Sequence, residues 1–294
     1  MATKKSTTSS TDDLLAKVEA LVDRIGRLLP SEAPPPDWSA TAFRWRRQNG
    51  VGRLVAVSRP HHIRLDDLHD IDTQKETIDR NTRQFVAGEA ANNVLLTGAR
   101  GTGKSSLVKA LLHAYADQGL RLIEVDKADL VDLPDIVEVV QDRAERFIIF
   151  CDDLSFDAAE AAYKALKVVL DGSIAAASEN VLIYATSNRR HLMPEYMAEN
   201  LEYKHLDDEI HPGETTEEKI SLSERFGLWL SFYPFNQDEY LDIVGHWLRV
   251  MGCASEEITM SREAALQWAI QRGSRSGRVA WQFARDWAGQ KATK

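Results

Sequence analysis

The chain has 294 residues, which is enough for one large or two small domains, and 44% of them are hydrophobic, so it can bury a substantial core. Its net charge of −9 argues against a surface that coats nucleic acid as a whole, although a local basic patch is not excluded. The two cysteines, Cys151 and Cys253, lie far apart without metal-ligand spacing, which excludes a disulfide framework and fits a reducing compartment.

The beginning of the chain is polar. Residues 1–12 are rich in serine and threonine, which predicts a disordered tail, and they lack the apolar core of a signal peptide. No apolar run in the chain approaches the ~20 residues of a membrane span. We therefore expect a cytoplasmic protein without a membrane partner.

An amphipathic helix is predicted next, because apolar residues recur at spacings of four and three from Leu14 to Leu28, and Pro30 ends the pattern. The stripe is short, which makes it weak evidence for a coiled coil. Docking on the chain's own core is the simpler interpretation. Self-association or contact with a partner is the alternative.

Aromatic residues alternate with arginines from Phe43 to Arg47, beyond a stiff proline-rich linker at residues 33–37. Such side chains could stack on nucleic-acid bases. They could equally bury the rings and leave the guanidinium groups in water. We favour the structural interpretation because the cluster is short and the chain is acidic.

A buried strand, a glycine-rich loop and a helix are predicted in succession between Asn93 and Leu112. The strand is the run 93–97, and the next eight residues match the phosphate-binding pattern G-x-x-x-x-G-K-[ST] in full. A chance match is disfavoured because strand and helix are both in place. The predicted nucleotide-binding residues are Gly98, Ala99, Arg100, Gly101, Thr102, Gly103, Lys104, Ser105 and Ser106.

The chemistry of phosphate binding explains these residue types. Glycines lack side chains, so backbone N–H groups can close around phosphate oxygens, and the N-terminus of the following helix adds positive partial charge. Lys104 is expected to reach the β- and γ-phosphates of ATP, and the Ser105 hydroxyl is expected to bind Mg²⁺.

Further apolar runs, separated by helical segments, predict strands at residues 120–125, 147–151, 181–185 and 228–232. This alternation predicts an α/β fold, a doubly wound parallel five-stranded sheet covered on both faces. From Asn236 onward helical periodicity continues without strands. The expected divisions are an N-terminal tail, helix and linker (1–59), an ATPase core (60–235) and a helical lid domain (236–294).

Polar side chains follow two of the predicted strands. Asp152 and Asp153 end the third strand, where a carboxylate can hold Mg²⁺; we assign this role to Asp152, together with Ser105, and expect Asp153 to polarise the attacking water. Asn188 follows the fourth strand and is expected to face the same water. Alternatively, the aspartates and the asparagine simply form turns.

Two arginines complete the predicted site. Arg225 precedes the fifth strand, where it could reach the nucleotide of a neighbouring subunit or form an ion pair with Glu224 or Glu218. Arg278 begins the last predicted helix and could lie over the phosphates; Arg275 is the second candidate for this position.

These motifs, in this order, resemble those of the AAA+ ATPases. More narrowly, the chain is similar to one bacterial AAA+ family of unknown function, known only as ATP-binding. This closer resemblance covers roughly residues 60 to 290 and rests on the strings at residues 92–96, 151–156, 184–192 and 221–230.

The resemblance implies a role for each residue. Asp152 and Asp153 correspond to Walker B, Asn188 to sensor 1, Arg225 to the arginine finger and Arg278 to sensor 2 in the lid. AAA+ ATPases in general usually have Asp-Glu where this chain has Asp-Asp. Aspartate is shorter by about 1.5 Å, and a displaced base can cost on the order of 10²-fold in rate. Slow hydrolysis is therefore expected, which suits a switch or loader better than a processive motor.

The stretch 195–220 is strongly acidic, and we hypothesise that it contacts a partner or a neighbouring subunit. A metal site at His205, Asp207 and His211 is disfavoured because their spacing fits no common site.

The sequence thus predicts an ATP·Mg²⁺-binding ATPase that forms a homo-oligomer through Arg225 and couples nucleotide state to assembly or to remodelling of an unknown protein client. The alternative is a switch or loader with little hydrolysis, an adaptor for a protein or nucleic-acid complex, although the net charge does not support nucleic acid. A small-molecule kinase is disfavoured by the arginine and lid pattern.

Overall fold

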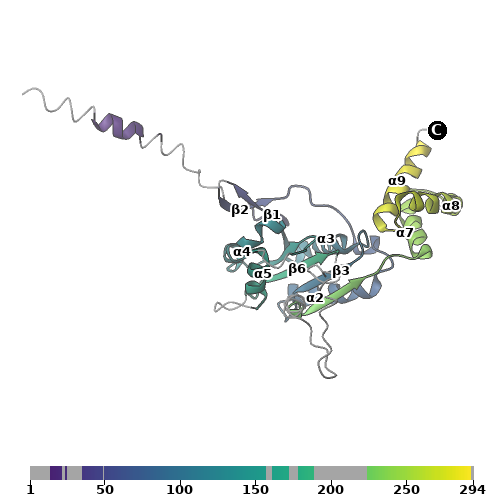
Figure 1. Cartoon of the computed structure of the whole chain (residues 1–294), viewed down its shortest axis with the longest axis horizontal. Coiled ribbons are helices and arrows are strands. Elements are labelled where there is room, and N and C mark those ends of the chain that lie inside the picture. Colours follow the sequence, from purple (N-terminus) through teal and green to yellow (C-terminus); the bar gives the residue numbers. More distant parts are fainter. Residues whose placement is uncertain are drawn as a thin grey trace, which may run out of the picture.

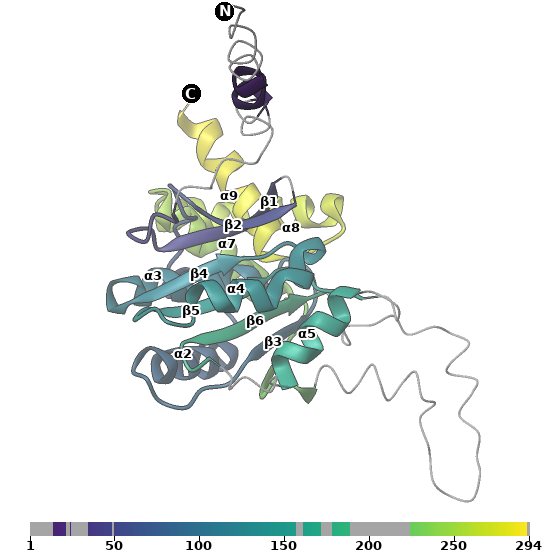
Figure 2. The same cartoon turned by 90° about the vertical axis from the view of Figure 1, so that its left-hand side faces the viewer.

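A single mostly parallel sheet forms the centre of the fold (Figures 1 and 2). The computed structural model describes residues 14–21, 24, 35–48, 50–156, 161–171, 178–188 and 224–292. The predicted tail at residues 1–12 and the acidic stretch at 195–220 lie outside these ranges, so both predictions stay untested.

The described part of the chain contains seven strands in one sheet, two more than predicted. They are β1 (Ala42–Gln48), β2 (Val51–Ala56), β3 (Val94–Gly98), β4 (Leu120–Glu124), β5 (Arg146–Cys151), β6 (Val181–Ser187) and β7 (Leu228–Phe232). Their order is β2-β1-β4-β5-β6-β3-β7, and every neighbouring pair is parallel except β1 and β2. The five predicted strands correspond to β3–β7, which confirms the parallel α/β sheet.

Helices cover both faces of this sheet. Those of the core are α2 (Asp72–Val86), α3 (Lys104–Tyr115), α4 (Leu133–Val140) and α5 (Ala161–Asp171), with short 3₁₀ turns η1 (Leu65–Asp67), η2 (Ala116–Gln118) and η3 (Lys127–Asp132). Successive strand residues point to opposite faces. Accordingly Leu96 packs in one apolar cluster with α2 and α3, and Leu95 packs in a second cluster with α4 and α5. The sheet is therefore doubly wound, as predicted.

The two additional strands form a hairpin at one edge of the sheet. β1 pairs in parallel with β4, so the sheet begins at Ala42, upstream of residue 60 where the sequence placed the start of the core. Phe43 and Trp45 are 1% and 2% exposed, whereas Arg44 forms an ion pair with Glu124. Buried rings with solvated guanidinium groups confirm the structural interpretation of this stretch.

Trp45 packs against Gly52 across the hairpin. A Cβ on Gly52 would lie 2.0 Å from the indole ring, and the indole N–H donates to Asp132 at 2.9 Å, which prevents the ring from moving aside. We expect Gly52→Ala to lower the free energy of unfolding by about 1–3 kcal/mol, the usual cost of overpacking. Urea unfolding measures this. Gly289→Ala is the control because its Cβ would meet nothing within 4 Å; equal midpoints for both variants would contradict the prediction.

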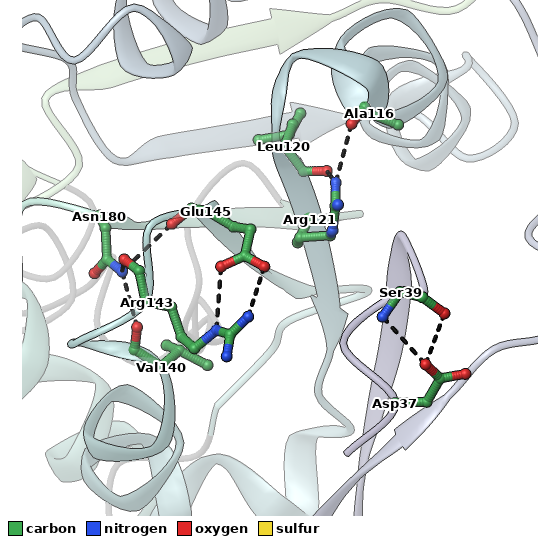
Figure 3. Close-up of polar contacts among 9 residues, drawn as sticks. All are labelled: Asp37, Ser39, Ala116, Leu120, Arg121, Val140, Arg143, Glu145 and Asn180. Carbon is green, nitrogen blue, oxygen red and sulfur yellow. Dashed lines mark hydrogen bonds and ion pairs between the residues drawn. The ribbon is translucent and has the colours of Figure 1, made fainter.

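Polar contacts tie the end of α4 to the strands that carry the candidate site (Figure 3). The Asn180 side chain donates from Nδ2 to the carbonyl oxygens of Val140 and Arg143 at 2.8 and 3.0 Å, and Arg143 forms an ion pair with Glu145 at 2.8 Å. These bonds give a side-chain donor to carbonyl oxygens at the end of α4 and just beyond it, where the helix itself supplies no partner. They join the loop before β5 to the loop before β6.

Three helices follow β7 and form a separate group beside the sheet, drawn in green and yellow in Figure 1. They are α7 (Gln237–Val250), α8 (Ser255–Arg272) and α9 (Gly277–Ala292). Asn236 caps α7, because its side chain accepts the N–H groups of Asp238 and Glu239 at 2.9 and 3.0 Å. The helices predicted after the last strand are therefore confirmed.

Residues 14–21 are helical, as predicted. Their apolar side chains, which are Leu14, Leu15, Val18 and Leu21, are between 49% and 63% exposed. This part of the stripe therefore does not dock on the chain's own core, contrary to the simpler interpretation. Among the described residues, no helix has the length and apolar character needed to cross a bilayer.

Candidate nucleotide-binding site

The loop between β3 and α3 turns at three glycines with positive φ, which are Gly98 (127°), Gly101 (74°) and Gly103 (94°). Glycine adopts such backbone angles without a steric penalty. Two of them also lie in close contact with other parts of the chain, where a side chain would not fit. A Cβ on Gly98 would lie 1.9 Å from the carbonyl oxygen of Phe232, and a Cβ on Gly101 would lie 2.8 Å from Cβ of Ser276. These glycines therefore allow β7 and α9 to approach the loop.

Lys104 is the first residue of α3 and is only 5% exposed. Its Nζ donates to the carbonyl oxygens of Gly98 and Ala99 at 2.8 and 2.7 Å and to Oδ1 of Asn188 at 3.2 Å. Burial lowers the pKa of Lys104, and the nearby carboxylates at the end of β5 oppose that shift. Its three hydrogen-bond partners are uncharged oxygen atoms, so a phosphate anion would be a better partner for this ammonium group than those it has.

The two residues predicted to bind Mg²⁺ lie side by side. Ser105 donates from Oγ to Oδ1 of Asp152 at 2.6 Å, and the Thr186 hydroxyl donates to the same oxygen at 2.6 Å. Hydroxyl and carboxylate oxygens suit Mg²⁺, which commonly takes one or two protein ligands and completes its octahedron with waters and phosphate oxygens. The donor set of Ser105 and Asp152 therefore fits a nucleotide-bound magnesium ion.

Thr186 is a site residue that the sequence interpretation missed. It is 2% exposed, and its Oγ1 accepts the backbone N–H of Asp153 at 2.9 Å while donating to Asp152. One buried hydroxyl thus orients both aspartates. The available signal was its position at the end of a buried strand two residues before Asn188, because a buried hydroxyl there needs a partner on a neighbouring strand.

Asp153 and Asn188 are also brought together. Asn188 donates from Nδ2 to Oδ1 of Asp153 at 2.5 Å, and its own Oδ1 accepts from Lys104, so it links the lysine to the second aspartate. Asp153 has a φ of 53°, in the left-handed region. Aspartate and asparagine occupy this region more readily than most residues with longer side chains. The backbone thus supplies a physical reason for aspartate at this position.

Arg225 lies far from its own phosphate loop. It precedes β7, which runs parallel to β3 with Leu228 beside Val94 and Phe232 beside Gly98. Arg225 is therefore at the amino edge of the sheet, while the loop follows its carboxyl edge. The guanidinium group is paired with Asp171, the last residue of α5. Arg225 thus forms an ion pair, but with Asp171, which is neither of the two glutamates named from the sequence, and Glu218 lies outside the described residues.

Of the two predicted lid arginines, Arg278 has its Cβ next to the loop. That atom is 3.8 Å from the position of a Cβ on Gly101, and the preceding Gly277 donates its N–H to the Gly101 carbonyl oxygen at 2.9 Å. Arg275 instead lines a cavity together with Arg100. This geometry favours Arg278 as the arginine nearer to bound phosphates.

The cavity has a volume of about 660 Å³ and lies between the phosphate loop and the helical domain. It is lined by Ala99, Arg100, Thr102, Pro234, Phe235, Gln237, Leu266, Ala269, Ile270, Gly273, Ser274 and Arg275. Lys104, Ser105 and the residues of β5 and β6 are not part of this lining. The cavity therefore borders the phosphate loop through Ala99, Arg100 and Thr102 but does not include the lysine or the two candidate Mg²⁺ ligands.

A family comparison matches almost all of the described core and helical domain. The family described as "Protein of unknown function (DUF815)" matches residues 38–291. The chain belongs to this family. The match confirms the resemblance to a family of unknown function, and it extends upstream to include both strands of the β1–β2 hairpin. A search of curated proteins found no match for this DUF815 chain.

Solved structures match much of the chain at low identity. A Thermotoga maritima RuvB variant is 18% identical, with a TM-score of 0.49, over 76% of this DUF815 chain and 63% of the RuvB chain. A chain of the Escherichia coli MS115-1 HORMA:CdnC:Trip13 complex is 12% identical, with a TM-score of 0.47, over 76% and 90% of the two chains. The DUF815 chain thus spans less than two thirds of the RuvB chain that it matches.

Proposed function

We propose that this protein binds ATP with Mg²⁺ and hydrolyses the bond that joins the γ-phosphate to the rest of ATP, in a site shared between subunits. The observation that supports this most is the convergence of Lys104, Ser105, Asp152 and Asn188 at the carboxyl ends of three strands of the sheet, β3, β5 and β6. A complete phosphate-loop motif begins there at the strand end, where such a loop binds phosphate.

Each side chain has a separate task in this proposal. Ser105 and Asp152 would hold Mg²⁺, which supplies positive charge to the phosphate oxygens. Lys104 would exchange its bonds to the loop carbonyl groups for phosphate oxygens. Asp153 would accept a proton from the attacking water. Asn188, which donates to Asp153, would hold that carboxylate and the water in position for attack on the γ-phosphate.

Positive charge on the γ-phosphate would come from the arginines. Arg278 is close enough to the loop in the same chain to serve the bound nucleotide, and Arg225 of a second copy would complete the site. Nucleotide state would then move the helical domain and change assembly or the binding of a protein client.

Lys104→Ala tests ATP binding directly. The substitution removes charged hydrogen bonds worth about 1.5–3 kcal/mol, so the Kd for ATP should rise about 10- to 150-fold. Isothermal titration with Mg²⁺ present measures this change. Lys109→Ala, on the same helix, is the matched control and should bind as the wild type does. An equal Kd for Lys104→Ala and Lys109→Ala would refute the proposed binding mode.

A switch or loader with little hydrolysis is the second candidate. Two features of Asp153 support this candidate. Its side chain is short, and its Oδ1 already accepts a hydrogen bond from Asn188. Tight ATP binding with turnover at background, at every protein concentration tested, would favour this candidate over the ATPase.

A further inference from the structure

Helix α9 begins directly on the phosphate loop. The N–H of Gly277 donates to the carbonyl oxygen of Gly101 at 2.9 Å. Ser276 covers the same glycine, because a Cβ added to Gly101 would lie 2.8 Å from Cβ and 2.9 Å from Oγ of Ser276. Two successive residues at the start of α9 therefore contact one residue of the loop.

The start of α9 is also fixed within the helix itself. Ser276 is 6% exposed and acts as the helix cap: its Oγ accepts the N–H of Val279 at 3.3 Å, and its carbonyl oxygen accepts that of Ala280 at 2.9 Å. Gly277 is the first helical residue, and a Cβ there would lie 3.3 Å from the Gly101 carbonyl oxygen. Glycine thus allows the helix to sit close enough for the hydrogen bond.

This contact sets the position of the next residue, Arg278. The cap fixes the start of the helix, and the bond fixes that start against the loop, so Cβ of Arg278 is held 3.8 Å from the Cβ position of Gly101. The loop turns its N–H groups toward phosphate in such motifs. Because Gly277 uses a carbonyl oxygen of the loop, its bond does not compete with phosphate for those N–H groups.

We propose that Gly277 is a positioning residue, whose hydrogen bond to Gly101 holds α9 on the phosphate loop and directs Arg278 to the γ-phosphate. The proposal rests on the ATP-binding function proposed above. It assigns discrimination between ATP and ADP to a backbone contact between the loop and the helical domain.

Gly277→Pro tests this role. Proline has no N–H and is well tolerated at the first position of a helix, and a capping residue before it adopts the extended backbone that proline requires. The Kd for ATP should rise about five-fold, which is the change in affinity expected from the loss of one neutral hydrogen bond. The Kd for ADP should change less than about two-fold, because ADP lacks the phosphate that Arg278 would contact. Titration with each nucleotide gives both values.

Three further variants separate positioning from folding. Gly289→Ala, in the same helix, should leave both Kd values unchanged, whereas Gly277→Ala keeps the N–H and should give an intermediate rise for ATP. In Arg278→Ala, adding Gly277→Pro should cause no further loss, since the bond acts through that arginine.

The outcomes distinguish this inference from the function on which it rests. Wild-type protein that fails to bind ATP would refute the proposed function and the inference together. Wild-type binding with an unchanged ratio of ATP and ADP affinities in Gly277→Pro, or additive losses in the double variant, would refute only the positioning role of Gly277.

Discussion

Replacing Arg225 by alanine is expected to lower ATP turnover by the assembled protein about 10³- to 10⁵-fold and to leave the Kd for ATP unchanged. The reason is geometric. Arg225 precedes β7 at the amino edge of the sheet, and the five residues of β7 alone span about 13 Å at about 3.3 Å per residue. Arg225 therefore cannot reach the phosphates of its own chain, and any catalytic role must be in a neighbour's site.

The ion pair with Asp171 calls for a control. Asp171 is the last residue of α5, where the helix dipole disfavours a carboxylate, so Arg225 compensates for an unfavourable charge. Arg225→Ala could thus disturb the end of α5 as well as remove a catalytic cation. Asp171→Asn breaks the same pair and keeps the arginine. If both variants lose turnover equally, the loss does not identify Arg225 as the catalytic group.

A mixing experiment gives the decisive measurement. Arg225→Ala chains keep an intact phosphate loop, and Lys104→Ala chains keep an intact arginine. Mixed in one assembly, they should form some complete sites and recover part of the turnover that neither variant has alone. Turnover per subunit of the wild type should also rise with protein concentration. No recovery on mixing, or a wild-type rate independent of concentration, would contradict a shared site.

The core of the fold could be predicted because its signals are local in sequence. Each of β3–β7 consists mostly of apolar residues, and the phosphate loop combines glycines, a lysine and a serine within eight residues. The functional side chains follow these runs directly, as with Asp152 after β5 and Asn188 after β6. Parallel strands bring their carboxyl ends to one edge, so chain position alone predicted that these groups would meet.

The features that were missed depend on partners far away in sequence. The β1 strand alternates aromatic residues with arginines, and its register depends on pairing with β4, including Arg44 with Glu124, 80 positions later. The contact of Gly101 with α9 is likewise invisible in the motif, because glycine is expected there for phosphate binding alone. Periodicity identifies an element, whereas its neighbours depend on tertiary packing.

Asp153→Asn is expected to reduce ATP hydrolysis by about 10²- to 10⁴-fold, the usual contribution of a general base, while the Kd for ATP stays within a few-fold of the wild type. Asparagine has nearly the same shape as aspartate, and it also tolerates the left-handed backbone that residue 153 adopts, where Asp153 has a φ of 53°. The substitution therefore removes the negative charge with little effect on the local fold. Single-turnover hydrolysis and ATP titration measure the two quantities separately.

Asp153→Glu is the matched comparison, because it introduces the longer carboxylate usual in the AAA+ ATPases whose motifs this sequence resembles. Its extra reach of about 1.5 Å should bring the carboxylate closer to the attacking water, but a longer side chain in the left-handed region costs about 1–2 kcal/mol. If Asp153 is the base, turnover should fall in Asp153→Asn and persist in Asp153→Glu, with a lower unfolding midpoint for the latter. If the wild type and Asp153→Asn turn over ATP equally slowly, Asp153 is not the base, and the protein acts through ATP binding alone.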